Sequence, residues 1–262
     1  MTDMIAAALV RALFNLLNTR PGSLAWEPFA GSGTPALEAS LLGINCVATD
    51  LSPLCVLLTR VKVRSAEAVV EIRARVAELL KDPTLNVESF DPEEEPDERV
   101  REFIQIARMV TFSDSARRGR ESAPWFRRNL ASMLESVEAH ARAISESHLR
   151  PGKVISLLAD AGNLSTTRIE PGSVETVVTS PPYSIALDYV KNDEPALEAL
   201  EADIPALRKS MTGVRGRAHE KLELYNQDMR AMYLASPQRE GRLPPGRSLP
   251  GRRPPRRLED VH

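Results

Sequence analysis

Two turn sequences in this 262-residue chain carry residue types that could hold a ligand and transfer a chemical group. The first is FAGSGT, residues 29–34, which lies between an apolar run and a helical pattern. Glycine has no Cβ, so Gly31 and Gly33 would let backbone N–H groups come close to a ligand. Asp50 ends the next apolar run, 17 positions after Gly33. An acid at about 20 positions from such a turn accepts hydrogen bonds from ribose hydroxyls in nucleotide-binding sheets.

A purely structural explanation of these residues stays open. Gly31 and Gly33 could only form the turn, and Asp50 could cap a helix that begins at Ser52. Glu27 precedes the turn and adds a carboxylate that suits a cationic group better than a phosphate; alternatively, it caps a helix or pairs at the strand end. Because the sequence is not GxGxxG and lacks GK[ST], a pyrophosphate or triphosphate ligand is disfavoured.

The second turn sequence is SPPY, Ser180 to Tyr183, which closes another apolar run. Two prolines cannot continue a β-ladder because each lacks an N–H group, but they form a stiff turn whose carbonyls remain acceptors. A serine hydroxyl, a fixed carbonyl and an aromatic face together suit a planar base with an exocyclic amine. The ring would stack on the base while the oxygens accept from the amine. The alternative is an ordinary strand end closed by proline.

Strands and helices alternate on both sides of a helical middle segment, which predicts a parallel α/β sheet that brings both turns to one edge. Thr34 is placed to cap the first helix after the glycine turn, with Pro35 in its first turn and Gly43 as its end. A later helix over 52–82 is predicted to break near Arg64. The other predicted elements are strands at 23–29, 44–50, 153–160 and 173–180, helices at 4–18, 98–112, 125–148 and 219–235, a short helix within 181–201, and a loop at 113–124.

Composition narrows the class of protein without identifying it. Hydrophobic residues make up 42% of the chain and charged residues 27%, and the formal net charge is −2, which is ordinary for a soluble protein. No run reaches the roughly 20 apolar residues that cross a bilayer, so no membrane partner is predicted. Cys46 and Cys55 lack metal-ligand or CxxC spacing, which predicts reduced thiols and a cytoplasmic location. The four histidines form no ligand pattern, so no metal is predicted.

FAGSGT and TSPPY together resemble the DNA amino-methyltransferases that use S-adenosylmethionine, within the N4-cytosine/N6-adenine group. The resemblance covers roughly residues 20–62 and 153–230. It implies a Rossmann-like methyltransferase sheet and S-adenosylmethionine as cofactor. The predicted cofactor-binding residues are Glu27, Phe29, Ala30, Gly31, Gly33, Thr34, Asp50 and Asp160.

The same resemblance makes SPPY the catalytic motif, with Ser180, Pro181, Pro182 and Tyr183 as its residues. Tyr183 would stack on a base flipped out of the duplex, and Ser180 and the Pro181 carbonyl would accept from its amine. Serine in the first position favours N4-cytosine over N6-adenine. DNA is therefore the predicted substrate, in a restriction-modification or epigenetic system. An RNA base amine is the alternative substrate.

An arginine cluster lies in the helical middle segment. Its members are predicted to contact phosphates or, alternatively, to form a solvated helix face paired with nearby acids. The predicted domains are residues 1–64 (cofactor-binding half), 65–150 (helical insertion and candidate target-recognition region), 151–235 (catalytic half) and 236–262 (disordered Arg/Pro-rich tail). The arginines of the cluster are Arg117, Arg118, Arg120, Arg127 and Arg128.

The resembled family has three further strands after the catalytic motif, which this sequence does not supply. The sheet is therefore predicted to be incomplete on its C-terminal side. Three explanations stay open: a fragment, one half of a split enzyme whose second subunit supplies the strands, or a degenerate copy. A non-catalytic protein that keeps the methyltransferase fold is the third functional hypothesis, beside the DNA and RNA enzymes.

Overall fold

A four-stranded parallel sheet lies at the centre of the chain, in the order β3-β2-β1-β4. Trp26 of β1 pairs with Val47 of β2 and with Val177 of β4, so β1 is flanked on both sides. The strands are β1 (Leu24–Glu27), β2 (Asn45–Asp50), β3 (Val154–Leu158) and β4 (Thr176–Val177). The computed structural model describes residues 7–88, 91–148, 150–167, 169–183, 188–217 and 220–236.

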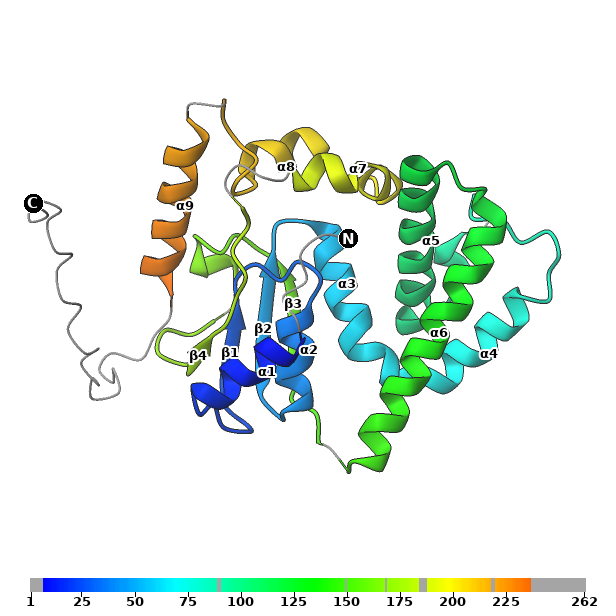
Figure 1. Cartoon of the computed structure of the whole chain (residues 1–262), viewed down its shortest axis with the longest axis horizontal. Helices are drawn as coiled ribbons and strands as arrows, with labels where there is room; N and C mark the ends of the chain where they lie inside the picture. The colour runs from blue at the N-terminus through cyan, green and yellow to red at the C-terminus, as the bar shows by residue number, and fades with distance from the viewer. Residues whose placement is uncertain are drawn as a thin grey trace, which may run out of the picture.

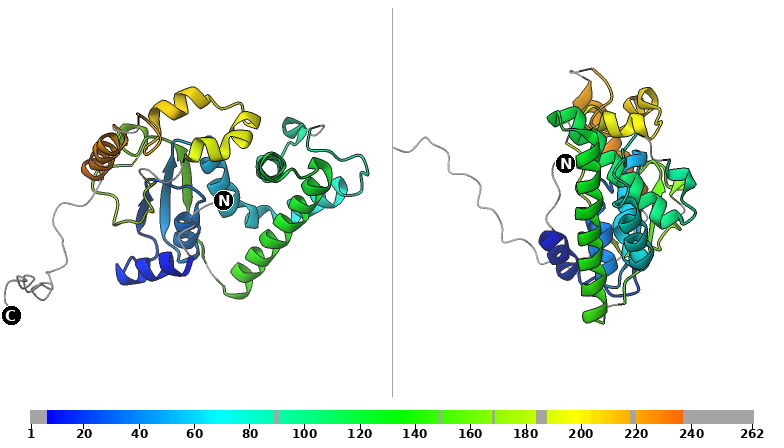
Figure 2. Two further views of the ribbon diagram at one scale, coloured as in Figure 1. Left: turned by 45° about the horizontal axis from the view of Figure 1, so that its top comes forward. Right: turned by 90° about the vertical axis from the view of Figure 1, so that its right-hand side faces the viewer.

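Helices surround this sheet and extend well beyond it. Figures 1 and 2 show α4, α5 and α6 beside the sheet on the side of β3, while α7 and α8 pass over its upper edge. The α-helices are α1 (Ala7–Leu16), α2 (Thr34–Leu41), α3 (Pro53–Arg64), α4 (Val69–Leu79), α5 (Glu98–Arg118), α6 (Ser122–Glu146), α7 (Tyr189–Ala199), α8 (Ile204–Ser210) and α9 (Lys221–Ala235). The 3-10 turns are Ser65–Ala68, Pro92–Glu94 and Leu164–Thr166.

The two faces of the sheet are covered by different helices. On one face, Phe14 of α1 and Ala36 of α2 share a buried cluster with Cys46 of β2. On the other face, Met232 of α9 joins the fully buried Trp26 in a second cluster. Burial on both faces explains why β1 and the middle of β2 are nearly continuous apolar runs. The predicted Rossmann-like parallel α/β fold is confirmed. Within the described residues, β4 has no strand on its outer side.

A third core joins the helical segment to the sheet through α3. Leu57 and Val61 of α3 belong to the same buried cluster as Phe103 and Ile104 of α5. The helix breaks after Arg64 into a 3-10 turn before α4 begins, as the sequence predicts. α3 therefore has one side on the sheet and the other in the helical core.

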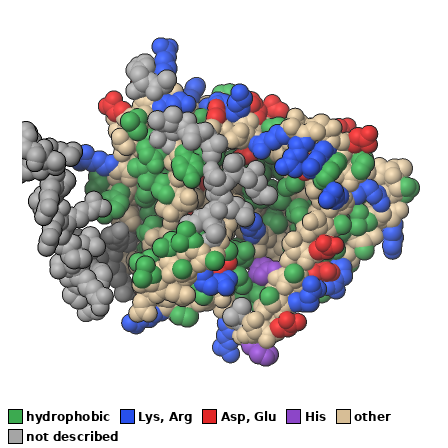
Figure 3. Space-filling model, in the orientation of Figure 1, with side chains coloured by type: hydrophobic (Ala, Val, Ile, Leu, Met, Phe, Trp, Pro, Cys, Tyr) green, Lys and Arg blue, Asp and Glu red, His purple; other side chains and the backbone are tan. Residues whose placement is uncertain are grey.

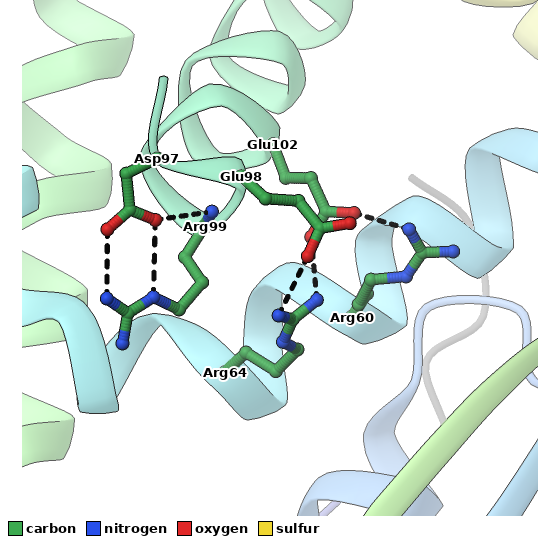
Figure 4. A network of polar contacts seen from close by, with 6 residues as sticks. All are labelled: Arg60, Arg64, Asp97, Glu98, Arg99 and Glu102. Carbon is green, nitrogen blue, oxygen red and sulfur yellow. Dashed lines mark hydrogen bonds and ion pairs between the residues drawn. The ribbon is translucent and has the colours of Figure 1, made fainter. Parts of the chain in front are cut away.

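Charged side chains reinforce the contact between α3 and α5 (Figure 4). Arg60 pairs with Glu102, and Arg64 pairs with Glu98 at 3.0 Å and with Glu102 at 3.6 Å. The Glu102 side chain is nearly buried, so its two arginine partners compensate a charge that burial would otherwise penalise. At the start of α5, the Asp97 carboxylate accepts from the Arg99 N–H and side chain, which lowers the pKa of Asp97 to about 2.

Two predictions about helix boundaries are wrong. The expected loop at 113–124 is mostly helical, because α5 continues to Arg118 and α6 begins at Ser122. Gly119, with φ of +61°, ends α5, so only three residues connect the two helices. Helix α8 is not predicted, although Asp203 caps it by accepting from the Ala206 N–H at 2.9 Å. The predicted tail at 236–262 lies outside the described residues except for Ser236.

Candidate active site

One cavity of about 790 Å³ opens where the four parallel strands end. The turns after β1, β2, β3 and β4 all contribute to its wall, as expected for ligand sites at the carboxyl edge of such sheets. α3, α5, α7 and α8 close its other sides. The predicted site residues that line it are Glu27, Phe29, Ala30, Gly31, Asp50, Asp160, Ser180, Pro181, Pro182, Tyr183, Arg117 and Arg118.

Asp50 connects the first two turns. Its Oδ2 atom accepts from the Gly31 N–H at 2.9 Å, and its Oδ1 atom accepts from the Ser52 N–H at 2.8 Å. Asp50 thus binds the N–H of Ser52, the N-cap residue of α3, and not an N–H of the first helical turn. Each carboxylate oxygen has two lone pairs, so Asp50 keeps acceptor capacity toward the cavity. Burial raises the pKa of Asp50, and the hydrogen bonds from Ser52 and Gly31 oppose that shift.

The two glycines of the first turn have different structural roles. Both have positive φ, +51° at Gly31 and +75° at Gly33. A Cβ on Gly31 would meet only the Phe29 carbonyl oxygen, at 3.9 Å, whereas a Cβ on Gly33 would lie 2.8 Å from the Thr59 Cα. Gly33 therefore allows α2 and α3 to pack closely, and neither it nor Thr34 lines the cavity. The sequence predicts that both glycines let a ligand approach the backbone. Only Gly31 has open space beside it and borders the cavity.

Glu27 supplies the cap that the sequence assigns to Thr34. Its Oε2 atom accepts from the Ala36 N–H at 3.0 Å, in the first turn of α2. Thr34 is already helical and makes no capping hydrogen bond, since Gly33 occupies the N-cap position. Glu27 is only 2% exposed, and burial together with the charge of Asp50 raises its pKa well above the usual value. The capping alternative for Glu27 is therefore realised, while the residue also borders the cavity.

The SPPY turn is held from outside the sheet. The Tyr183 N–H donates to the Tyr189 hydroxyl at 3.3 Å, and Tyr189 is the first residue of α7. Asp188 caps α7 by accepting from the Lys191 N–H at 2.9 Å, and it also binds Arg208 of α8 at 2.9 Å. The Tyr183 side chain is 48% exposed, so its ring remains available to a ligand. The sequence predicts no site role for Asp188 or Tyr189.

The turn after β3 is built around Asp160. The Asp160 Oδ1 atom accepts from the Gly162 N–H at 2.8 Å, which orders the turn at the cavity rim. Asp160 is exposed and leaves its other oxygen, Oδ2, facing solvent or a ligand. This position at the third strand end agrees with a contact to the cofactor adenine, which stays a prediction.

The predicted arginine cluster divides into two groups. Arg117 and Arg118 line the cavity, where Arg117 pairs with Asp193 at 3.5 Å. Arg118 and Arg120 both pair with Asp114, at 3.3 Å and 3.2 Å. Lys and Arg side chains gather over the upper part of α5 and α6 in Figure 3. These ion pairs agree with the alternative prediction that the arginines form a solvated helix face paired with nearby acids. Each guanidinium still has further N–H donors for a phosphate.

The remaining arginines lie away from the cavity wall. Arg127 donates to two carbonyls at the C-terminal end of α4, so it stabilises a helix end. Arg120 and Arg128 lie over the ring of Trp125, 3.5 Å and 4.6 Å from its centroid. A phosphate contact through Arg127 would require it to leave those carbonyls.

No group of three or more potential metal ligands occurs in the part of the chain that the structure describes. His219 and His262 lie outside the described residues. Cys46 is buried and Cys55 half-buried, both are free thiols, and burial raises the pKa of each. Among the described helices, none has the length and apolar character that a bilayer crossing needs.

Comparison with known proteins agrees with this architecture. A family model described as "RMKL-like, methyltransferase domain" matches residues 1–82, which include the glycine turn, Asp50 and α3. The match supports a methyltransferase, and the parallel sheet with its helices is consistent with the Rossmann-like fold of that class. The matched range ends before the SPPY turn. Neither the curated proteins nor the solved structures contain a significant match to the chain.

Proposed function

We propose that this protein transfers a methyl group from S-adenosylmethionine to the exocyclic amine of a nucleic-acid base, with N4 of cytosine in DNA as the favoured target. The supporting observation is that the glycine turn, Asp50 and the SPPY turn border one cavity. A methyl donor and a base can therefore meet in the same space. The cavity volume also falls within the range of about 300–1,000 Å³ that is usual for small-molecule sites.

The first two turns fit the cofactor. Gly31 presents an unobstructed backbone surface to the cavity, because no side chain lies where its Cβ would be. Asp50 offers carboxylate oxygens to ribose hydroxyls while its hydrogen bonds to Gly31 and Ser52 fix its orientation. When bound, S-adenosylmethionine supplies an electrophilic methyl group on a sulfonium. Buried carboxylates near that cation stabilise it electrostatically, which is one role for Asp50 and Glu27.

The SPPY turn fits the target base. Tyr183 offers an exposed ring for stacking, which contributes about 1–3 kcal/mol per base. Ser180 Oγ and the Pro181 carbonyl would accept from the amine, localise its lone pair and orient it toward the methyl group. Positioning of this kind is the main source of rate enhancement when no covalent enzyme intermediate forms. A base inside a duplex must first be flipped out, at a cost of a few kcal/mol.

An RNA base amine is the second candidate target. The matched family model describes a methyltransferase domain without naming its substrate, and it covers the predicted cofactor-binding residues from Glu27 to Asp50. A planar amine-bearing base from RNA would use the same stacking and acceptor groups. Serine in the first position of SPPY is what favours DNA cytosine in the proposal.

A methyl-transfer assay with isotope-labelled S-adenosylmethionine tests the proposal. Duplex DNA, single-stranded DNA and RNA are incubated separately, and the nucleic acid is digested to nucleosides that are separated by chromatography. Label in N4-methylcytosine supports the favoured target, whereas label in an RNA nucleoside supports the second. Asp50→Ala should weaken cofactor binding in a calorimetric titration. Absence of both cofactor binding and transfer would leave the non-catalytic hypothesis.

A further inference from the structure

Arg117 and Asp193 form a charged pair on the cavity wall opposite the strand ends. Arg117 comes from the last turn of α5 and Asp193 from α7, and both side chains line the same cavity as Gly31 and Asp50. The proposed transfer of a methyl group to a base amine assigns no role to Asp193. The sequence predicts Arg117 as a phosphate contact or as part of a solvated helix face, and it predicts no role for Asp193.

The contact between these two groups is loose. The Arg117 Nη2 and Asp193 Oδ1 atoms are 3.5 Å apart, longer than the 2.7–2.9 Å typical of charge-assisted hydrogen bonds. By comparison, Asp188 and Arg208 approach to 2.9 Å in the same region. Within the described residues, neither Arg117 nor Asp193 makes a second side-chain hydrogen bond. A guanidinium has five N–H donors and a carboxylate two acceptor oxygens, so most of their capacity is unused.

Asp193 lines the same cavity as Asp50 and Cys55. Burial is the main cause of the raised pKa of the Cys55 thiol, and the charges of Asp50 and Asp193 add to it. Burial raises the pKa of Asp193 itself, and the Arg117 charge opposes this shift only in part. A partly desolvated carboxylate of this kind gains from an additional cation.

We propose that the Arg117–Asp193 pair binds the amino-acid end of S-adenosylmethionine. The assignment rests on the proposed function, because it assumes that cofactor. The amino-acid end of S-adenosylmethionine carries an ammonium and a carboxylate on one carbon. These adjacent opposite charges match the Arg117 guanidinium and the Asp193 carboxylate, which lie side by side. Asp193 accepts from the ammonium, and Arg117 donates to the carboxylate. Two short charge-assisted contacts then replace one long ion pair.

Two nucleosides distinguish this role from a purely structural one. S-adenosylhomocysteine has the amino-acid end, whereas 5′-methylthioadenosine lacks it and keeps the adenosine. Affinities of both for the full chain are measured by calorimetry in the wild type, Arg117→Ala and Asp193→Ala. A hydrogen bond to a charged group contributes about 1.5–3 kcal/mol. We therefore expect each variant to bind S-adenosylhomocysteine about tenfold more weakly or worse, with unchanged affinity for 5′-methylthioadenosine.

Matched variants complete the experiment. Arg73→Ala removes an arginine of α4 that pairs with Glu138 and does not line the cavity, and it should leave both affinities unchanged. Arg117→Lys keeps the charge and should recover part of the affinity for S-adenosylhomocysteine. Equal weakening of both ligands in Arg117→Ala and Asp193→Ala, or no weakening of either, would overturn the assignment. Wild-type protein that binds neither ligand would overturn the proposed function itself, and this assignment with it.

Discussion

The glycine turn and the SPPY turn both border the cavity, but different kinds of contact hold them in place. The glycine turn is fixed from below by buried groups, since Asp50 binds the Gly31 N–H and Glu27 binds the start of α2. The SPPY turn has an exposed tyrosine, and a hydrogen bond of 3.3 Å from the Tyr183 N–H to the Tyr189 hydroxyl links it to α7. The proposed cofactor side is therefore built into the core. The proposed target side depends on a helix that lies outside the sheet.

The largest expected effect is the loss of stability when Gly33, which packs against α3, is replaced by alanine. In Gly33→Ala, the new Cβ would lie within 3.0 Å of three Thr59 atoms, and the residue would keep a left-handed backbone. Overpacking of about 1–3 kcal/mol and backbone strain of about 1–2 kcal/mol should lower the free energy of unfolding by about 2–5 kcal/mol. Gly31→Ala has the strain without the clash and should lose only about 1–2 kcal/mol. Urea denaturation compares the two; equal losses would contradict the different roles of the glycines.

On the exposed side, Tyr183→Ala should affect catalysis and leave stability nearly unchanged. Loss of stacking worth about 1–3 kcal/mol predicts a methyl-transfer rate lower by about 5- to 150-fold. Tyr233→Ala is a matched control, because Tyr233 is an exposed tyrosine on α9 and is 70% exposed. The rate comes from the labelled-methyl assay and the cofactor affinity from calorimetry. Full activity of Tyr183→Ala would remove the basis for assigning it to the target base.

The link between the SPPY turn and α7 is tested by Tyr189→Phe. The variant keeps the ring but removes the hydroxyl that accepts from the Tyr183 N–H. A neutral hydrogen bond contributes about 0.5–1.5 kcal/mol, so kcat should fall about two- to tenfold while KM for the cofactor stays constant. Tyr225→Phe on α9 is the control. A change in cofactor KM without a change in kcat would show that Tyr189 does not position the target side.

The smallest expected effect concerns the buried acid below the glycine turn. Because burial raises the pKa of Glu27, the folded protein favours its protonated form. This contribution to stability is complete below pH about 4.5 and is lost as the pH rises through the folded-state pKa. The stability of the wild type should therefore decline relative to Glu27→Gln as the pH increases from 4.5 to 8. Urea denaturation at several pH values measures the difference, with exposed Glu88→Gln as the control; parallel profiles would contradict the shift.

Local signals in the sequence predict the framework of the site. Apolar runs ending in Glu27 and Asp50, the Pro-marked helix starts and the break after Arg64 all depend on neighbouring residues, and the structure contains each of them. The common edge of the glycine and SPPY turns follows from the parallel order of the strands. These features could be predicted because their causes lie within a few residues of each position.

The unpredicted features depend on contacts between distant segments. Gly33 is required by Thr59, a residue of the next helix, and no local pattern reveals that approach. Arg117 was assigned to a loop, yet α5 continues through it and directs it toward Asp193, 76 positions later. The Tyr189 hydroxyl contacts Tyr183 only because α7 begins where it does. Such residues could not be assigned without knowing how the helices pack.

The position of α3 has a consequence for protein engineering. Leu57 and Val61 of α3 are buried by α5, and Arg60 and Arg64 are neutralised by its acids. Excising residues 65–150, or replacing them with the equivalent segment of another protein, would uncover an apolar stripe and remove the partners of two arginines on the helix that contributes Leu54 and Leu58 to the cavity wall. A successful exchange of substrate preference would therefore have to redesign the outer surface of α3 together with the transplanted helices.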